Sequence, residues 1–107
     1  MKKDIILCGV GGDGIVSVAK IISDAALNLG LNVKQSEIHG MAQRGGSVFA
    51  HIRLSDGEIY SPLISEHGAD MIISMEPLEV YRYTKFLNKN TKLIVNATPF
   101  KNINNYP

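Results

Sequence analysis

The chain has 107 residues and a formal net charge of +1 at pH 7, with 45% hydrophobic and 20% charged residues. This balance is typical of one globular domain, and it excludes the basic excess of a nucleic-acid-binding domain and the acidic tail of a protein that binds basic partners. The longest apolar runs are too short to cross a membrane, and the run after the basic N-terminal residues ends in glycines instead of a signal-peptide core. We therefore expect a single domain over residues 1–107 that works in the cytoplasm and binds neither nucleic acid nor membrane.

Cys8 is the only cysteine of the sequence. It lies within an apolar run, which predicts a buried strand residue and not a reactive thiol. A conventional iron–sulfur cluster needs about four thiolate ligands, so this chain cannot hold one by itself. A disulfide within the chain is likewise excluded.

A strand, a glycine-rich turn and a helix open the chain. Residues 4–8 form a short apolar run, which predicts a fully buried strand of a parallel sheet. After the turn at residues 9–14, apolar side chains recur at helical spacing over residues 15–29. Gly30 then stands where a left-handed residue commonly ends a helix.

The middle of the chain departs from a simple strand–helix repeat. Residues 33–38 alternate in polarity and predict a second strand, which completes a strand–helix–strand unit with a right-handed crossover. Residues 48–54 alternate as well, and the Asp-Gly pair within residues 55–58 favours a tight hairpin turn. We expect the returning strand of this hairpin to begin at residues 59–60.

Two more strands and a helix are predicted in the last third of the chain. Residues 70–75 and 92–96 are apolar runs, and Pro77 marks the start of a helix that reaches about residue 87. A parallel strand at residues 92–96 needs cover on both faces, so we expect a larger unit or a partner to supply it. The predicted fold class is α/β, a Rossmann-like three-layer domain with a mostly parallel sheet and an inserted β-hairpin.

The turn after the first strand carries a candidate binding motif. Gly9, Gly11 and Gly14 form G-x-G-x-x-G between a strand and a helix, where the unpaired N–H groups of a helix start suit an anion. Glu37 follows near the position of the ribose-binding acid of a dinucleotide fold. Asp13 opposes that interpretation, because a carboxylate inside the loop repels phosphate. A close turn that only needs glycine, an anionic ligand and a nicotinamide site all remain open.

A second candidate segment spans residues 36–47. It gathers an acid, an imidazole, an amide and a guanidinium among glycines, and loops on a rigid scaffold commonly carry function. Arg44 could clamp a phosphate or a carboxylate, and His39 could donate a proton or contact a ligand. The alternative is a structural turn in which Arg44 pairs with a nearby acid.

The glycine turn and the stretch S-E-I-H-G-M-A-Q-R-G-G-S-V at residues 36–48 resemble the gamma-type domain of pyruvate and 2-oxoacid:ferredoxin oxidoreductases. The His-Gly-Met and Gln-Arg-Gly-Gly blocks are similar to the indolepyruvate branch, whose matching part is its beta subunit. The resemblance covers residues 4 to about 98. Asp13 departs from the family, which usually has Gln there. Family subunits are longer than this chain, so we expect the domain to be incomplete at its C-terminus.

The resemblance implies a subunit that is inactive alone. A large partner subunit would hold thiamine diphosphate, magnesium and 4Fe-4S clusters, and CoA would be a cosubstrate of the complex. The reaction would be oxidative decarboxylation of a 2-oxoacid, an arylpyruvate such as indolepyruvate, with ferredoxin as the electron acceptor. The alternative function is a stand-alone Rossmann-like nucleotide-binding or interaction domain.

The two candidate loops are expected to meet at the C-terminal edge of the sheet and to face the CoA side of the active site. The alternative is that they contact only the catalytic subunit. No catalytic or metal-binding residue is expected on this chain, and His51, His67, Tyr81 and Tyr83 are interpreted as structural. The residues expected to face the cofactor are Gly9, Gly11, Gly12, Gly14, Glu37, His39, Gln43, Arg44, Gly45 and Gly46.

Overall fold

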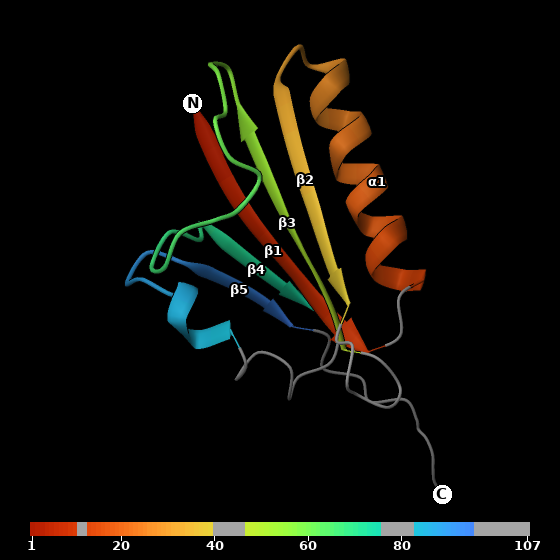
Figure 1. Cartoon of the computed structure of the whole chain (residues 1–107), viewed down its shortest axis with the longest axis vertical. Helices are drawn as coiled ribbons and strands as arrows, with labels where there is room; N and C mark the ends of the chain where they lie inside the picture. Colours follow the sequence, from red (N-terminus) through yellow and green to blue (C-terminus); the bar gives the residue numbers. More distant parts are fainter. Residues whose placement is uncertain (11–12, 40–46, 76–82, 96–107) are drawn as a thin grey trace, which may run out of the picture.

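The computed structural model describes residues 1–10, 13–39, 47–75 and 83–95. One five-stranded sheet, in the order β2-β3-β1-β4-β5, forms the centre of the molecule (Figure 1). A short turn of 3₁₀ helix at residues 83–86 lies between β4 and β5 along the chain. The elements are β1 (Lys2–Val10), α1 (Asp13–Asn28), β2 (Asn32–His39), β3 (Ser47–Ser55), β4 (Met71–Ser74) and β5 (Lys92–Val95).

Four of the five strands run in the same direction. β1 pairs with β4, and β4 with β5, in parallel, whereas β3 lies antiparallel between β2 and β1. The predicted α/β class with a mostly parallel sheet is therefore confirmed. β2 and β3 form an antiparallel pair, and β3 separates the two parallel strands that α1 connects.

The predicted partner of the strand at residues 48–54 was wrong. Residues 59–60 form no strand, and β3 pairs with β2 and β1 instead. The reason lies in Arg53, whose Nη1 donates to the carbonyl oxygens of Ser61 at 3.2 Å and Leu63 at 3.1 Å. This contact draws the chain after the Asp-Gly turn across the sheet face, so its carbonyls bind a guanidinium and not a neighbouring strand.

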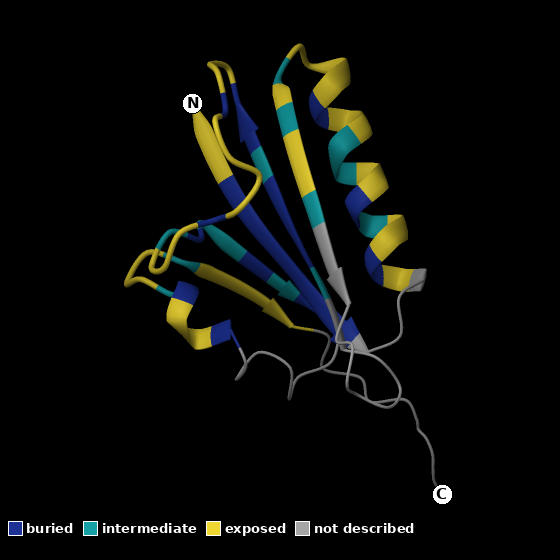
Figure 2. Ribbon diagram, viewed as in Figure 1, coloured by how far each residue is buried: buried dark blue, intermediate teal, exposed yellow. Residues whose placement is uncertain are grey.

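β1 is the centre of the core and is buried from residue 4 to residue 9. Figure 2 shows β1 buried along most of its length, and its alternate side chains enter two separate hydrophobic clusters, one on each face of the sheet. The first cluster joins α1 to the sheet and comprises Ile5, Leu7, Ile15, Ala19, Ala26, Ala50, Ile52 and Leu54. The second lies under the segment 59–70 and the turn 83–86 and comprises Ile6, Cys8, Ile64, Ala69, Ile72, Tyr83 and Phe86.

These two clusters give the domain its three layers. α1 covers one face, and the segment before β4 together with the turn at residues 83–86 covers the other. Cys8 is fully buried in the second cluster, which confirms its prediction as a buried strand residue. The helix predicted to start at Pro77 falls on residues outside the described part, except for the turn at residues 83–86.

α1 ends as the sequence predicts. Gly30 adopts a left-handed conformation with φ of 82°, and its N–H donates to the carbonyl of Leu27 at 3.0 Å. The N–H of Leu31 donates to the carbonyl of Ala26, also at 3.0 Å, so two carbonyls of the last turn are satisfied. The glycine thus turns the chain directly into β2.

β5 is an edge strand whose four residues are all exposed. Leu93 is 49% exposed, Ile94 52% and Val95 37%. Apolar edge strands normally pair with or lie beneath another segment, because open backbone groups and apolar side chains promote association. That a larger unit or a partner covers this strand stays a prediction.

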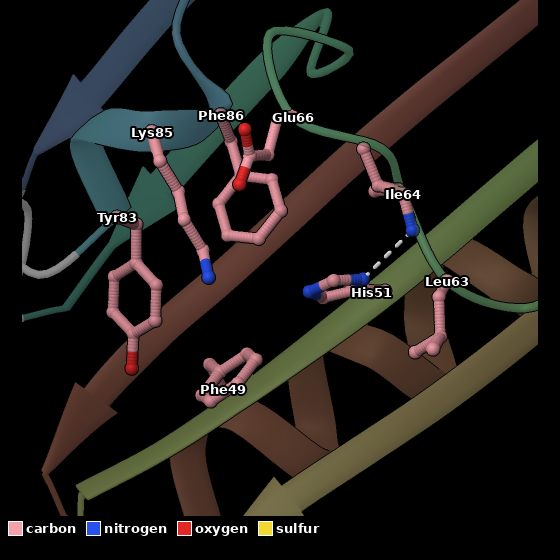
Figure 3. A pocket seen from close by; sticks show the side chains of 8 residues that line it. All are labelled: Phe49, His51, Leu63, Ile64, Glu66, Tyr83, Lys85 and Phe86. Atoms are coloured by element: carbon pink, nitrogen blue, oxygen red, sulfur yellow. Dashed lines mark hydrogen bonds between the residues drawn. The ribbon is translucent and has the colours of Figure 1, made fainter.

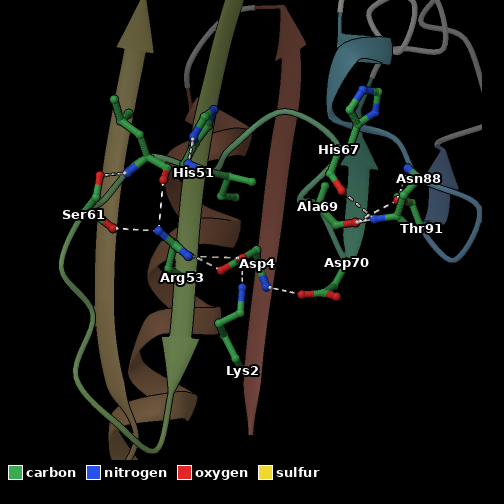
Figure 4. Close-up of polar contacts among 12 residues, drawn as sticks. Lys2, Asp4, His51, Arg53, Ser61, His67, Ala69, Asp70, Asn88 and Thr91 are labelled. Atoms are coloured by element: carbon green, nitrogen blue, oxygen red, sulfur yellow. Dashed lines mark hydrogen bonds and ion pairs between the residues drawn. The ribbon is translucent and has the colours of Figure 1, made fainter.

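A buried ion pair joins β1 to β3 (Figure 4). The Asp4 carboxylate, only 1% exposed, accepts from Arg53 Nε at 3.0 Å and from Lys2 Nζ at 2.7 Å. The same Asp4 is tied to Asp70 by two hydrogen bonds of 2.8 Å, one from each backbone N–H. Arg53 and Asp4 therefore hold the segment 59–70 at both of its ends.

Replacing Arg53 with Met is expected to lower the free energy of unfolding by about 3 kcal/mol, because it leaves the buried Asp4 carboxylate without its guanidinium partner. Lys20→Met removes an exposed i,i+4 pair with Asp24 and is the matched control, with an expected loss below about 0.5 kcal/mol. Urea unfolding of both variants measures the difference. Equal losses would contradict the role given to the buried pair.

Candidate functional site

The candidate loops begin and end at one edge of the sheet. In the strand register Val10 lies opposite Ser47, while Gly9 and His39 both lie opposite Val48 from its two sides. The last residues of β1 and β2 and the first of β3 are therefore neighbours, and α1 begins at the same edge (Figure 1). Ligands of open α/β sheets bind at this carboxyl edge of the parallel strands.

Gly9 is required by packing. A Cβ at this position would lie 3.0 Å from Met75 Cβ and 3.3 Å from Ile15 Cδ1. The N–H of Met75 donates to the carbonyl of Cys8 at 2.8 Å, so the backbone cannot move away without losing a hydrogen bond. At this position the glycine serves the close approach of β1, α1 and the end of β4.

Gly14 is different. It is exposed in the first turn of α1, its φ is not left-handed, and a Cβ there would meet no heavy atom of the described residues within 4 Å. Packing and backbone geometry therefore do not explain a glycine here. An open backbone at a helix start, where N–H groups lack intrahelical partners, suits the close approach of an anion or of another chain.

The other predicted site residues are placed only in part. Glu37 and His39 lie in the last three residues of β2, where their backbone pairs with Ala50 and Val48. Their side chains are outside the described part of the structure. The remaining six also fall outside the described residues, and their roles stay predictions: Gly11, Gly12, Gln43, Arg44, Gly45 and Gly46.

His67 holds two segments of the chain together, and its lack of a catalytic role stays a prediction. It adopts a left-handed backbone conformation with φ of 60°, and its Nδ1 lies 2.9 Å from the carbonyl oxygen of Leu87. Asn88 Nδ2 donates to the His67 carbonyl at 2.8 Å (Figure 4). These contacts lock the segment before β4 onto the segment before β5. Tyr81 lies outside the described residues, and Tyr83 is buried in the second cluster.

His51 marks a pocket that sequence reasoning missed (Figure 3). A cavity of about 520 Å³ opens on the sheet face opposite α1. Three aromatic rings, one lysine and one glutamate line the pocket together with the imidazole. The lining residues are Phe49, His51, Leu63, Ile64, Glu66, Tyr83, Lys85 and Phe86. The available signal was the run Phe49, His51 and Arg53, which places three large, non-aliphatic side chains on one face of β3.

Two further observations concern only the described residues. Among them, no group of three or more His, Cys, Asp or Glu side chains is arranged to hold a metal ion. No helix in that same part of the chain has both the length and the apolar character needed to cross a bilayer.

The comparison with protein families identifies the chain. The family model described as pyruvate ferredoxin/flavodoxin oxidoreductase matches residues 4–107. The chain belongs to this family. Indolepyruvate oxidoreductase subunit IorB of Archaeoglobus fulgidus is 53% identical over 97 residues, which is 91% of this chain and 47% of that protein. The subunit of the same name from Methanothermobacter thermautotrophicus is 43% identical over 98 residues, 92% of this chain and 49% of the relative.

The chain therefore spans about half the length of these curated relatives. Among solved structures, the keto/oxoacid ferredoxin oxidoreductase gamma subunit of Geobacter sulfurreducens matches with a TM-score of 0.68 at 24% identity, over 89% of this chain and 51% of that one. The 2-oxoglutarate:ferredoxin oxidoreductase of Magnetococcus marinus, solved with 2-oxoglutarate, coenzyme A and succinyl-CoA bound, matches with a TM-score of 0.75 at 19% identity, over 97% of this chain and 18% of that one. These structural likenesses confirm the fold.

The two glycines provide a matched pair of variants. Gly9→Ala is expected to lower the free energy of unfolding by about 1–3 kcal/mol, since the added methyl meets Met75 and Ile15. Gly14→Ala is expected to leave it unchanged or to raise it by about 0.5–1 kcal/mol, because alanine is the better helix former. Urea unfolding of the two variants checks both values. Destabilisation by Gly14→Ala would mean that folding itself requires this glycine.

The pH dependence of stability should carry the signature of His51. Burial, together with the Lys85 and Arg53 charges, lowers the pKa of His51 below its ordinary value of 6.5, although Asp4 acts in the opposite sense. Between the folded-state pKa and pH 6.5, His51 is protonated in the unfolded chain but not in the folded chain. The free energy of unfolding therefore falls as the pH drops from 6.5 towards the folded-state pKa. Above pH 6.5 this contribution is constant.

Thermal unfolding between pH 7.5 and 5 measures this effect. His51→Gln should lose less stability on acidification than the wild-type chain, because the imidazole no longer titrates. His67→Asn should lose as much stability as the wild-type chain, and asparagine tolerates the left-handed backbone at that position. An unchanged pH profile in His51→Gln would show that the histidine titrates alike in the folded and unfolded chains.

Proposed function

We propose that this chain is a non-redox, gamma-type part of a CoA-dependent 2-oxoacid:ferredoxin oxidoreductase of the indolepyruvate type. The observation that carries the proposal is the identity of 53% to an indolepyruvate oxidoreductase subunit over 91% of the chain. The 2-oxoglutarate synthase subunit KorC of Methanothermobacter marburgensis is 31% identical over 96 residues, so the indolepyruvate branch is favoured over the 2-oxoglutarate branch.

The proposed reaction is the oxidative decarboxylation of an arylpyruvate. The bond between the carboxylate and the 2-oxo carbon breaks and releases carbon dioxide, and the resulting acyl group is transferred to the thiol of CoA. Two electrons pass to two oxidised ferredoxins, and the thiol proton is released. The products are an aryl-acetyl-CoA, carbon dioxide and two reduced ferredoxins.

The redox cofactors belong to a partner in this proposal. The single cysteine of the chain is buried in the core, so its residues do not fit a 4Fe-4S cluster. A large subunit would therefore hold the clusters, thiamine diphosphate and magnesium, and would pass electrons to ferredoxin. The complex would work in the cytoplasm, and this chain would be inactive alone.

The carboxyl edge of the sheet is the part of this chain that we assign to CoA. The open backbone at Gly14, in the first turn of α1, supports the assignment. Arg44, in the sequence between β2 and β3, would supply the cation for a CoA phosphate. The competing role for the same loops is an interface with the catalytic subunit, for which glycines would permit a close backbone approach.

The exposed edge strand supports a larger assembly. Leu93, Ile94 and Val95 on β5 lie open to solvent in the described part of the chain. We propose that residues 1–107 are one incomplete gamma-type domain, and that further sequence or a partner covers β5. The share of about half of each curated relative that the chain spans agrees with this proposal.

Co-expression of the chain with the large subunit tests the proposed function. The co-purified complex should reduce a viologen dye only when indolepyruvate and CoA are both present, and each subunit alone should be inactive. A longer gamma-type chain serves as the control for incomplete assembly. If the short and the long chain both co-purify with the large subunit yet add nothing to its activity, the proposal is wrong.

The CoA assignment predicts the effect of charge reversal at Arg44. In the assembled complex, Arg44→Glu should raise the KM for CoA at least about tenfold, since it replaces an attraction to phosphate with a repulsion. The KM for the 2-oxoacid should change little. Lys34→Glu, on the exposed side of β2, is the matched charge reversal and should leave both constants unchanged.

The interface role predicts the opposite division. Arg44→Glu would then weaken co-purification, while the complex that survives would keep its KM for CoA. Size-exclusion chromatography before the kinetic assay separates the two results.

A further inference from the structure

The pocket beside His51 is separate from the carboxyl edge of the sheet. It lies on the sheet face opposite α1, between β3, the segment that precedes β4 and the turn at residues 83–86 (Figure 3). Phe49, Tyr83 and Phe86 form aromatic walls, and the Phe49 and Tyr83 ring centroids are 4.8 Å apart. The cavity volume of about 520 Å³ lies within the range of small-ligand pockets.

Hydrogen bonding determines which nitrogen of His51 carries the proton. The N–H of Ile64 donates to His51 Nδ1 at 2.9 Å, so Nδ1 is an acceptor. Burial and the Lys85 and Arg53 charges lower the pKa of this histidine, with Asp4 opposing them, and the ring is neutral at pH 7. In a neutral imidazole the other nitrogen then carries the hydrogen, so Nε2–H is a donor.

That donor is buried without an acceptor among the described residues. His51 is 3% exposed, and its Nε2 makes no hydrogen bond there. The Phe86 ring lies edge-on to the imidazole, with centroids 5.3 Å apart and an interplanar angle of 83°. An aromatic ring offers an N–H group only a weak contact, so the donor lacks a full partner. Buried polar groups in folded proteins normally have one.

Lys85 and Glu66 are the charged residues that line the pocket in the described part of the chain. Lys85 Nζ lies 5.3 Å from the Phe86 ring centroid, and Figure 3 shows its side chain extending between Tyr83 and His51. Glu66 lines the same pocket from the segment before β4. Lys85 is exposed, so its flexible side chain can swing outward and admit a ligand atom to Nε2.

We propose that this pocket is a binding site for a small aromatic carboxylate. The ring of the ligand would pack against the aromatic wall of Phe49, Tyr83 and Phe86, and one carboxylate oxygen would accept the hydrogen of His51 Nε2. The Lys85 ammonium would pair with the same carboxylate. This binding site does not depend on the proposed function.

Binding of indole-3-acetate to the full chain tests the proposal, with 3-methylindole as the probe that keeps the ring and lacks the carboxylate. Titrations followed by ¹H–¹⁵N NMR, including the histidine ring nitrogens, locate the site directly. Indole-3-acetate should bind saturably, shift the His51 Nε2 resonance and bind at least about tenfold more tightly than 3-methylindole.

Three variants divide the contributions of charge. Lys85→Met should weaken indole-3-acetate binding about tenfold, since it removes the cation and keeps the stem of the side chain. Glu66→Gln should leave binding equal or tighter, because it removes a like charge. Lys89→Met, at an exposed lysine that does not line the pocket, should change nothing.

Several results would overturn the proposal. Equal affinity for the two probes would remove the role of the carboxylate. The same would follow from unchanged binding in Lys85→Met, or from shifts that map to the first turn of α1 and not to His51. These readouts measure binding and not catalysis, so a negative result here leaves the proposed function untouched, and a negative activity assay leaves this binding site untouched.

Discussion

The buried pair of Asp4 and Arg53 is the interaction on which the rest of this fold depends. Asp4 begins the buried part of the central strand, and Arg53 lies directly opposite it on β3. The guanidinium satisfies the carboxylate with one edge and the carbonyls of Ser61 and Leu63 with another. A buried charge is tolerated only with such partners. One side chain thus sets both the neighbour of β1 and the path of the segment 59–70.

That path gives the two faces of the sheet different chemistry. The face under α1 is aliphatic, as in any packed strand–helix unit. The other face is covered by an irregular segment, so its backbone groups need side-chain partners. Ile64 finds one in His51 Nδ1, and Ala69 finds one in the hydroxyl of Thr91 at 2.7 Å. The aromatic pocket follows from this arrangement, because the imidazole commits one nitrogen to the segment and turns the other inward.

The sequence predicted the positions of the strands and of α1 better than it predicted which strands pair with each other. Alternation and apolar runs located all five strands, and Gly30 located the end of α1, because these signals are local. The partner of β3 was missed because the Asp-Gly turn is also a local signal. The choice between a hairpin and a path across the sheet lies in contacts of Arg53 with Asp4, 49 positions away in the sequence.

Sequence motifs predicted the candidate site at the carboxyl edge of the sheet, but they did not predict the pocket beside His51, which depends on contacts made only in the folded chain. The glycine motif located the carboxyl edge, and the structure then separated Gly9, which packing requires, from Gly14, which it does not. His51 gave no comparable signal, because a lone histidine on a strand looks like any polar residue. Burial and the Lys85 and Arg53 charges lower its pKa, with Asp4 opposing them, and the hydrogen bond from Ile64 leaves Nε2 as the donor; only folding brings these groups to it.

Amide hydrogen exchange on the assembled oxidoreductase tests the central claim most directly, namely that the carboxyl edge faces CoA. Exchange would be compared in the free chain, in the complex and in the complex with CoA. The first turn of α1, whose amides lack intrahelical partners, should gain protection only when CoA is added. β5 should gain it already on assembly. Protection of the first turn on assembly, with no further change on adding CoA, would contradict the account and assign that edge to the subunit interface.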